Sequence, residues 1–303
     1  MRSASSSTRR ARPLLGTFVV IATGEAASPG LDAVLDAAFD AVATVHSLMS
    51  FHEPSSDVSR LNREAGRGAV VVHDWTFEVL QAALDLDGRS GGVFDIAIAP
   101  ALQRLGRLPV HAGQPQPDAG TGKAGGFLLL DGNRVRFSGP EVSVDLGGIA
   151  KGYAVDRALA QLRRAGLASA HVNAGGDQAV FGGEPSEVHI RDPRQPGRLM
   201  TSIALYNGAV ASSGGSFDPV TSAHPGDSAV IDPTTGQSGN AIAGASVCAP
   251  TCMIADALTK VVMLMGQKST GLIEDYRASA LLVSANGEIC ATSNWPRGGT
   301  RAI

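Results

Sequence analysis

The sequence has few charged residues and no excess of either sign. Only 17% of its 303 residues are Asp, Glu, Lys or Arg, and the formal net charge is −3. A chain that remains disordered carries a high net charge, so we expect most of this one to fold, as one large domain or two small ones. Nucleic-acid binding needs clustered basic side chains, whereas Lys and Arg are thinly spread here. We therefore expect no nucleic-acid partner.

Cysteines are few, and long apolar runs are missing. The three cysteines, Cys248, Cys252 and Cys290, cannot all pair, and their spacing lacks the second ligand pair of a zinc site. We expect them to be small buried residues in a reducing compartment. No run approaches the roughly 18 apolar residues that a membrane span needs, so no span is predicted.

The N-terminal residues 1–12 are basic. They include Arg2, Arg9, Arg10 and Arg12, and the apolar segment after them is too short for the core of a signal peptide and lacks a small-residue cleavage site. We expect residues 1–12 to be a disordered tail, residues 13–303 to be one domain, and the protein to be cytoplasmic. If an export signal has been removed from the sequence, the compartment is instead the periplasm.

Four segments show the apolar spacing of helices. They are Leu31–Met49, Thr76–Leu86, Ile149–Ala165 and a segment that begins at Thr251 and ends at Gly266. In the first and the last, apolar residues recur every three or four positions. The second, the third and the last are followed by a glycine where a left-handed helix cap would lie.

Between these helices lie many short strand-like runs. The turns Asp131-Gly132-Asn133 and Ala285-Asn286-Gly287 each join two such runs and are typical of hairpins. Strands and helices do not alternate regularly. This order favours an α+β fold with mixed, largely antiparallel sheets and flanking helices. The remaining strand-like runs are Gly16–Ala22, Ala170–Val172, Ala179–Phe181, Val188–Ile190, Ser202–Leu205, Ala209–Ala211, Ala229–Ile231 and Ala243–Ala249.

Four clusters concentrate Asp, Gly and small residues beyond what a core requires: Ser90–Asp95, Val144–Gly152, Asn173–Asp177 and Ala255–Lys260. In the second, Asp and a Gly pair precede a helix, whose free N–H groups could hold a phosphate. Neither a P-loop nor a dinucleotide fingerprint is present. Each cluster alone is more often an ordinary turn.

Their order along the chain resembles the FAD:protein FMN transferases, the ApbE-type flavin transferases. The resemblance implies a single T-fold-like α+β domain that binds FAD and Mg²⁺. It implies transfer of FMN from FAD to a Ser or Thr hydroxyl of an acceptor flavoprotein, with release of AMP. The motifs that carry it are Leu15-Gly16-Thr17, Ser50-Phe51-His52, Ser59-Arg60-Leu61-Asn62, Gly91–Asp95, Asp145–Asp156, Asn173–Asp177, Ser212-Ser213-Gly214, Ile231–Gly236 and Ala255–Thr259.

The resemblance also implies a role for individual residues. It places Leu15 and His52 against the flavin nucleotide, Asp145 in a hydrogen bond with it, and Lys151 close to the FAD, although many family members have Met and Tyr at the first two positions. The residues implied to line the rest of the FAD site are Val93, Phe94, Asp95 and Ile231.

The metal site implied by the resemblance departs from the family at one position. The family uses a backbone carbonyl at Gly148, the carboxylate of Asp256, and oxygens at the third and fourth positions beyond it, here Thr259 and Lys260. Residues three and four apart share a helix face, so Asp256 and Thr259 could both reach a hard cation. A lysine ammonium only donates. Lys260 therefore either forms an ordinary ion pair with Asp256 or occupies the metal's place.

A second departure concerns the base that would deprotonate the acceptor hydroxyl. Many members have His where this chain has Ala229, and the nearby His224 could substitute or be an ordinary loop histidine. Asp256 and His224 are thus the candidate catalytic residues. The alternative to a transferase is an FAD-binding or carrier protein, or an FAD pyrophosphatase, that has lost transfer chemistry through Lys260 and Ala229.

Overall fold

The computed structural model describes residues 7–111, 126–214, 228, 230–239 and 241–296. An eight-stranded antiparallel sheet runs through the molecule in the order β1-β2-β6-β7-β10-β13-β14-β15. Three small sheets pair β3-β5-β4, β8-β9 and β11-β12. The α+β prediction with largely antiparallel sheets is confirmed.

The strands have the following bounds: β1 Thr8–Leu14, β2 Thr17–Thr23, β3 Val70–Val71, β4 Phe127–Leu130, β5 Arg134–Phe137, β6 Ala170–Ala174, β7 Asp177–Phe181, β8 Ser186–Asp192, β9 Gln195–Leu205, β10 Ala209–Gly214, β11 Ile231–Asp232, β12 Gln237–Ser238, β13 Ile242–Ala249, β14 Ser279–Ser284 and β15 Ile289–Ala291. The helices have these bounds: α1 Pro29–Met49, α2 Asp57–Glu64, α3 Asp74–Ser90, α4 Ala99–Arg104, α5 Ala150–Arg164, α6 Cys252–Met265, the 3₁₀ turn η1 Gly266–Ser269, and α7 Thr270–Asp275.

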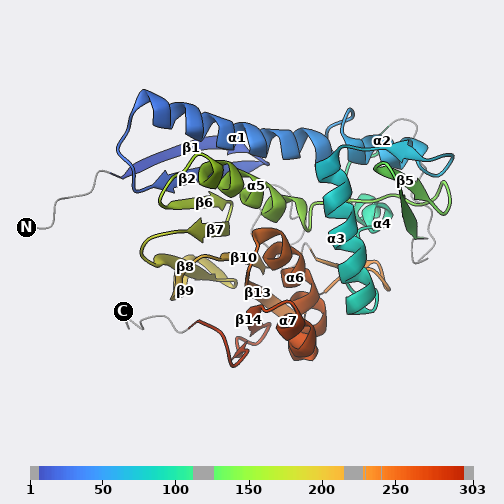
Figure 1. Cartoon of the computed structure of the whole chain (residues 1–303). Coiled ribbons are helices and arrows are strands. Elements are labelled where there is room, and N and C mark those ends of the chain that lie inside the picture. Colours follow the sequence, from blue (N-terminus) through green and yellow to red (C-terminus); the bar gives the residue numbers. More distant parts are fainter. Residues whose placement is uncertain (1–6, 112–125, 215–227, 229, 240, 297–303) are drawn as a thin grey trace, which may run out of the picture.

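The four predicted helices are present as α1, α3, α5 and α6. Helix α1 begins where Ser28 accepts a hydrogen bond from the Leu31 N–H, and α3 ends at Gly91, whose φ of 68° suits glycine. Helices α5 and α6 pack on the large sheet and on each other, and α1 packs on α5 (Figure 1). The main core lies between these helices and the sheet.

The prediction of a disordered tail through residue 12 is wrong for residues 8–12. They form most of β1, whose backbone pairs along its length with β2 from Thr8↔Thr23 to Leu14↔Thr17. Two of the arginines that suggested a solvated tail bond to acidic residues of α1. Arg10 donates to Asp32 at 3.0 Å, and Arg12 pairs with Asp36. Residues 1–6 lie outside the described residues.

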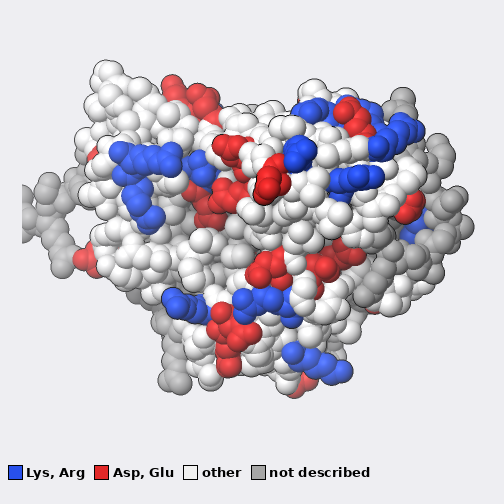
Figure 2. Space-filling view, turned by 45° about the vertical axis from the view of Figure 1, so that its right-hand side comes forward, with Lys and Arg blue, Asp and Glu red and all other residues white. Residues whose placement is uncertain are grey.

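The face of the molecule shown in Figure 2 carries charges of both signs. On the face shown in Figure 2, acidic and basic side chains intermingle, as the net charge of −3 leads one to expect. In the ranges that the structure describes, none of the helices combines the length and the apolar character of a membrane span.

Two of the three cysteines are buried, and we expect them to resist modification. Burial raises the pKa of the Cys248 thiol to about 12 and raises that of Cys252 well above its ordinary value, so few thiolates are present at pH 8. Cys290 is partly exposed. Ellman's reagent should therefore titrate one thiol in the native protein and all three in urea. Cys290→Ser should remove the native reaction, and fast reaction of the remaining thiols would contradict the burial.

Candidate functional site

A cavity of about 1170 Å³ opens beside the large sheet. Its walls come from the loops after α3 and before α5, the turn between β6 and β7, the end of β10, and strands β8, β9, β13 and β14. Sites for small ligands usually measure about 300–1,000 Å³, so this one suits a large ligand. Eight of the residues proposed from the sequence line it: Val93, Phe94, Asp95, Asp145, Gly148, Lys151, Ile231 and Lys260.

The other sequence candidates lie elsewhere. Asp256 and Thr259 are fully buried behind the cavity wall. His52 is exposed and does not line the cavity. Leu15, with a φ of 57° in the turn between β1 and β2, is not part of the cavity lining. His224 and Ala229 fall outside the described residues.

Asp145 is fixed by a hydrogen-bonded frame. The side chain of Asn62 brackets the preceding residue, donating to the Val144 carbonyl at 2.9 Å and accepting from its N–H at 2.8 Å. The Asp145 N–H bonds to the Ile96 carbonyl at 2.8 Å, and its carboxylate accepts from the Gly147 N–H at 3.0 Å. Burial raises the pKa of this carboxyl group. The carboxylate therefore stands at the cavity with little side-chain freedom.

The loop after α3 places Phe94 and Asp95. Gly91 and Gly92 both have positive φ, which allows the tight turn at the helix end. Ser90 then accepts from the Phe94 N–H at 3.0 Å, and the Asp95 carboxylate accepts from the Ala97 N–H at 2.7 Å. The glycine pair in this motif thus shapes the turn, while the three residues after it, Val93, Phe94 and Asp95, line the cavity.

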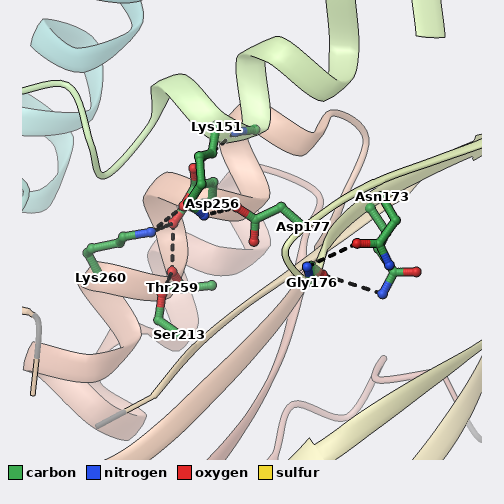
Figure 3. A network of polar contacts seen from close by, with 10 residues as sticks. Lys151, Asn173, Gly176, Asp177, Ser213, Asp256, Thr259 and Lys260 are labelled. Atoms are coloured by element: carbon green, nitrogen blue, oxygen red, sulfur yellow. Dashed lines mark hydrogen bonds and ion pairs between the residues drawn. The ribbon is translucent and has the colours of Figure 1, made fainter. Parts of the chain in front are cut away.

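Two lysines and two aspartates form a charge cluster beside the cavity, which we call the paired cluster (Figure 3). Lys151 of α5 pairs with Asp177 of β7, and Lys260 pairs with Asp256 one turn earlier on α6. Both aspartates are almost completely buried, whereas both lysines reach the cavity. The cluster therefore presents cations to the cavity and keeps their counter-charges inside.

The pKa directions follow from these pairings. Burial opposes ionisation of Asp256, but Lys151 and Lys260 outweigh it and lower the pKa. For Asp177, burial and the nearby Asp256 carboxylate raise the pKa despite the lysines. Burial acts to lower the pKa of Lys151, yet Asp177 and Asp256 raise it above its ordinary value. Lys151 is consequently a cation at neutral pH.

Backbone contacts between α5 and α6 hold Asp256 in place. The Gly152 N–H donates to Asp256 Oδ2 at 3.0 Å, and a Cβ on Gly152 would lie 2.2 Å from the Cys252 carbonyl oxygen. Asp156 accepts from the first N–H groups of α6, those of Cys252 and Met253, at 2.8 Å each. Glycine at 152 is required by this close approach of the two helices.

The residues that would coordinate Mg²⁺ do not fit that ion here. Asp256 Oδ1 is taken by Lys260 and Oδ2 by Gly152. The Thr259 hydroxyl donates to the Asp256 carbonyl at 2.6 Å and shares its other hydrogen bond with Ser213 at 2.7 Å. Across the part of the chain that is described, no cluster of three His, Cys, Asp or Glu residues could hold a metal ion.

The structure adds cavity residues that the sequence did not single out as site residues. His171 and Gln178 lie on β6 and β7 and are joined at 2.9 Å between Nε2 and Oε1. Asn173 of β6 accepts from the N–H of Gly176 in the turn between these strands, at 3.0 Å. Asn173 belongs to a motif noted in the sequence, so its signal was present. Arg9 and Arg107 line the cavity without any local pattern.

Most of this chain is similar to proteins of one known family. The model of the ApbE family matches residues 15–283. An FAD:protein FMN transferase of Vibrio cholerae is 28% identical over 74% of this chain and 71% of its own. One of Rhodobacter capsulatus is 31% identical over 71% of this chain but only 43% of its own. The crystal structure of the ApbE protein of Thermotoga maritima superposes with a TM-score of 0.81 at 26% identity, covering 96% of this chain and 98% of that one.

Proposed function

Because this chain belongs to the ApbE family, we propose that it is an FAD:protein FMN transferase. Relatives with this name match most of the chain. The observation that carries the proposal is the convergence of separate motifs on one cavity: Phe94 and Asp95 after α3, Asp145 before α5, and Lys151 within it. Core packing alone gives no reason for the polar side chains of Asp95, Asp145 and Lys151 to meet there.

In the proposed reaction, a Ser or Thr hydroxyl oxygen of the acceptor protein attacks the phosphorus on the flavin side of the FAD pyrophosphate. A new P–O bond joins FMN to the acceptor, the bond to the bridging oxygen breaks, and AMP leaves with that oxygen. The hydroxyl proton passes to solvent or to a base. Lys151 and Lys260 reach the cavity with their charges held in place, so they can stabilise the charge that grows on the leaving phosphate.

The acceptor can be found without knowing its identity. An extract of cells that lack this protein should be incubated with the purified protein and FAD. The mixture is then separated on a denaturing gel. Covalently bound FMN gives a fluorescent band, and mass analysis of its peptides should place FMN on Ser or Thr. No fluorescent band in any extract, with FAD still intact, would contradict transfer.

One observation favours a second candidate, an FAD carrier or an FAD pyrophosphatase. Lys260 engages the carboxylate that the family resemblance assigns to the metal. Chromatography of FAD incubated with the protein, with and without the acceptor, separates these activities. A transferase releases AMP only when acceptor is present, a pyrophosphatase releases AMP and FMN without it, and a carrier releases neither.

Asp145→Ala should weaken FAD binding by about 1–3 kcal/mol, because a fixed carboxylate that accepts a charge-assisted hydrogen bond from the nucleotide is lost. Flavin fluorescence titration measures the change. Asp36→Ala is the matched control: Asp36 pairs with Arg12 on the surface, outside this cavity, so the affinity should not change. Equal affinities for the two variants would refute the role of Asp145.

A further inference from the structure

We propose that the ammonium of Lys260 replaces the divalent cation in this chain, so that the site binds the FAD pyrophosphate without Mg²⁺. The part of the proposal that concerns FAD rests on the proposed function. The part that concerns the metal does not, because it follows from which atoms already occupy the ligand positions.

The Lys260 ammonium lies among the atoms that would surround a metal. It bonds to Asp256 Oδ1 and, at 3.0 Å, to the Asp256 carbonyl oxygen. The lysine side chain also covers Gly148, since a Cβ on that glycine would lie 3.6 Å from Lys260 Cε. The cation is therefore located between Gly148 and Asp256, two of the positions that the family resemblance gives to the metal.

Lys260 also retains a donor for a ligand. An ammonium has three N–H donors, and among the described residues its two acceptors both belong to Asp256. The side chain is 20% exposed and lines the cavity. The third N–H can therefore point at an oxygen of a bound phosphate. Lys151 lines the same cavity, so a pyrophosphate placed between the two lysines contacts a cation on each side.

Electrostatics disfavours a metal in addition to the lysine. The paired cluster holds two ammonium groups and two carboxylates, so its charges already cancel. A divalent ion at Asp256 would meet the Lys260 ammonium at close range in a buried site, where repulsion is weakly screened. To bind there, the metal must first displace the lysine from a buried carboxylate, which leaves a charge without its partner.

The test uses Mn²⁺ as the metal probe and FAD as the ligand, both with the full chain. Electron paramagnetic resonance measures Mn²⁺ bound without FAD, and flavin fluorescence measures FAD affinity in EDTA and in excess Mg²⁺. We compare the unaltered chain, Lys260→Thr, and the control Lys268→Thr, an exposed lysine after α6. Circular dichroism confirms that each variant is folded.

We expect the unaltered chain and Lys268→Thr to bind no Mn²⁺ at this site and to bind FAD with an affinity that differs less than about twofold between EDTA and Mg²⁺. Lys260→Thr should bind one Mn²⁺. Its FAD affinity should fall at least about tenfold in EDTA, through loss of a charge-assisted hydrogen bond, and recover when Mg²⁺ is added.

One Mn²⁺ bound by the unaltered chain and lost in Asp256→Asn would overturn the proposal, and so would FAD binding that requires Mg²⁺. Both measurements on the unaltered chain hold even if Lys260→Thr does not fold. Failure of FAD to bind under either condition would instead refute the proposed function, and the Mn²⁺ titration would still decide whether Lys260 excludes the metal.

Discussion

Asp256→Ala should lower the free energy of unfolding by about 3–5 kcal/mol, because it leaves buried charge without a partner. The carboxylate neutralises Lys260, lowers the energy of the charged Lys151, and accepts from the Gly152 N–H. After its removal the Gly152 N–H is buried with no acceptor from α6. Asp256→Asn keeps an oxygen for that N–H but no charge, so its loss should be smaller.

Urea denaturation followed by circular dichroism measures these differences. The matched control is Asp275→Ala, which removes the partner of Arg89 in an ion pair with a carboxylate side chain that is 63% exposed. An exposed pair contributes at most about 1 kcal/mol. If both variants lose the same small amount, water reaches the paired cluster and its charges do not depend on each other.

Gly152→Ala should destabilise the fold strongly, because it adds a methyl group where α5 and α6 are in close contact. The new Cβ would lie 2.2 Å from the Cys252 carbonyl oxygen and 2.8 Å from Asp256 Cβ. The first contact is with backbone, so a rotamer change cannot relieve it and the helices must separate. We expect a loss of about 3 kcal/mol or more in the free energy of unfolding, together with weaker FAD binding.

Gly88→Ala makes the same chemical change but should raise the free energy of unfolding. A Cβ at Gly88 in α3 meets nothing within 4 Å. Alanine has the higher helix propensity, so this variant should gain about 0.5–1 kcal/mol. Thermal unfolding of the two variants side by side checks both signs. A tolerated alanine at 152 would show that α5 and α6 can separate without cost.

The sequence predicted best those elements whose pattern is local. Helix α1 has a cap, a proline at its start and a continuous apolar stripe, and the hairpin between β4 and β5 has the turn Asp131-Gly132-Asn133. Helix α2 lacks such a stripe and was not predicted. It is held by tertiary bonds, since the Asp57 carboxylate accepts from the His73 N–H and the Thr76 hydroxyl at 2.8 Å each.

The residues of the site were predicted from the resemblance to a family. The geometry that decides their chemistry could not be predicted in this way. The spacing of Asp256 and Lys260 allows both a surface ion pair and a lysine in a metal's position. Only the fold shows that the carboxylate is buried and that the ammonium reaches a cavity. The partner of Lys151 is Asp177, 26 residues away on β7, and no helical or strand period connects them.

Strand β1 is one outer edge of the large sheet, and its basic side chains affect how the protein behaves at high concentration. An open edge with free backbone groups invites a strand of another molecule. Here Arg9 and Arg10 are exposed on that edge, and Arg10 and Arg12 are tied to α1. Two copies approaching edge to edge would bring their Arg9 side chains together, whereas Arg10 and Arg12 are already neutralised by Asp32 and Asp36. The opposite edge is β15, only three residues long. The sheet therefore ends on both sides in strands that resist aggregation by self-pairing.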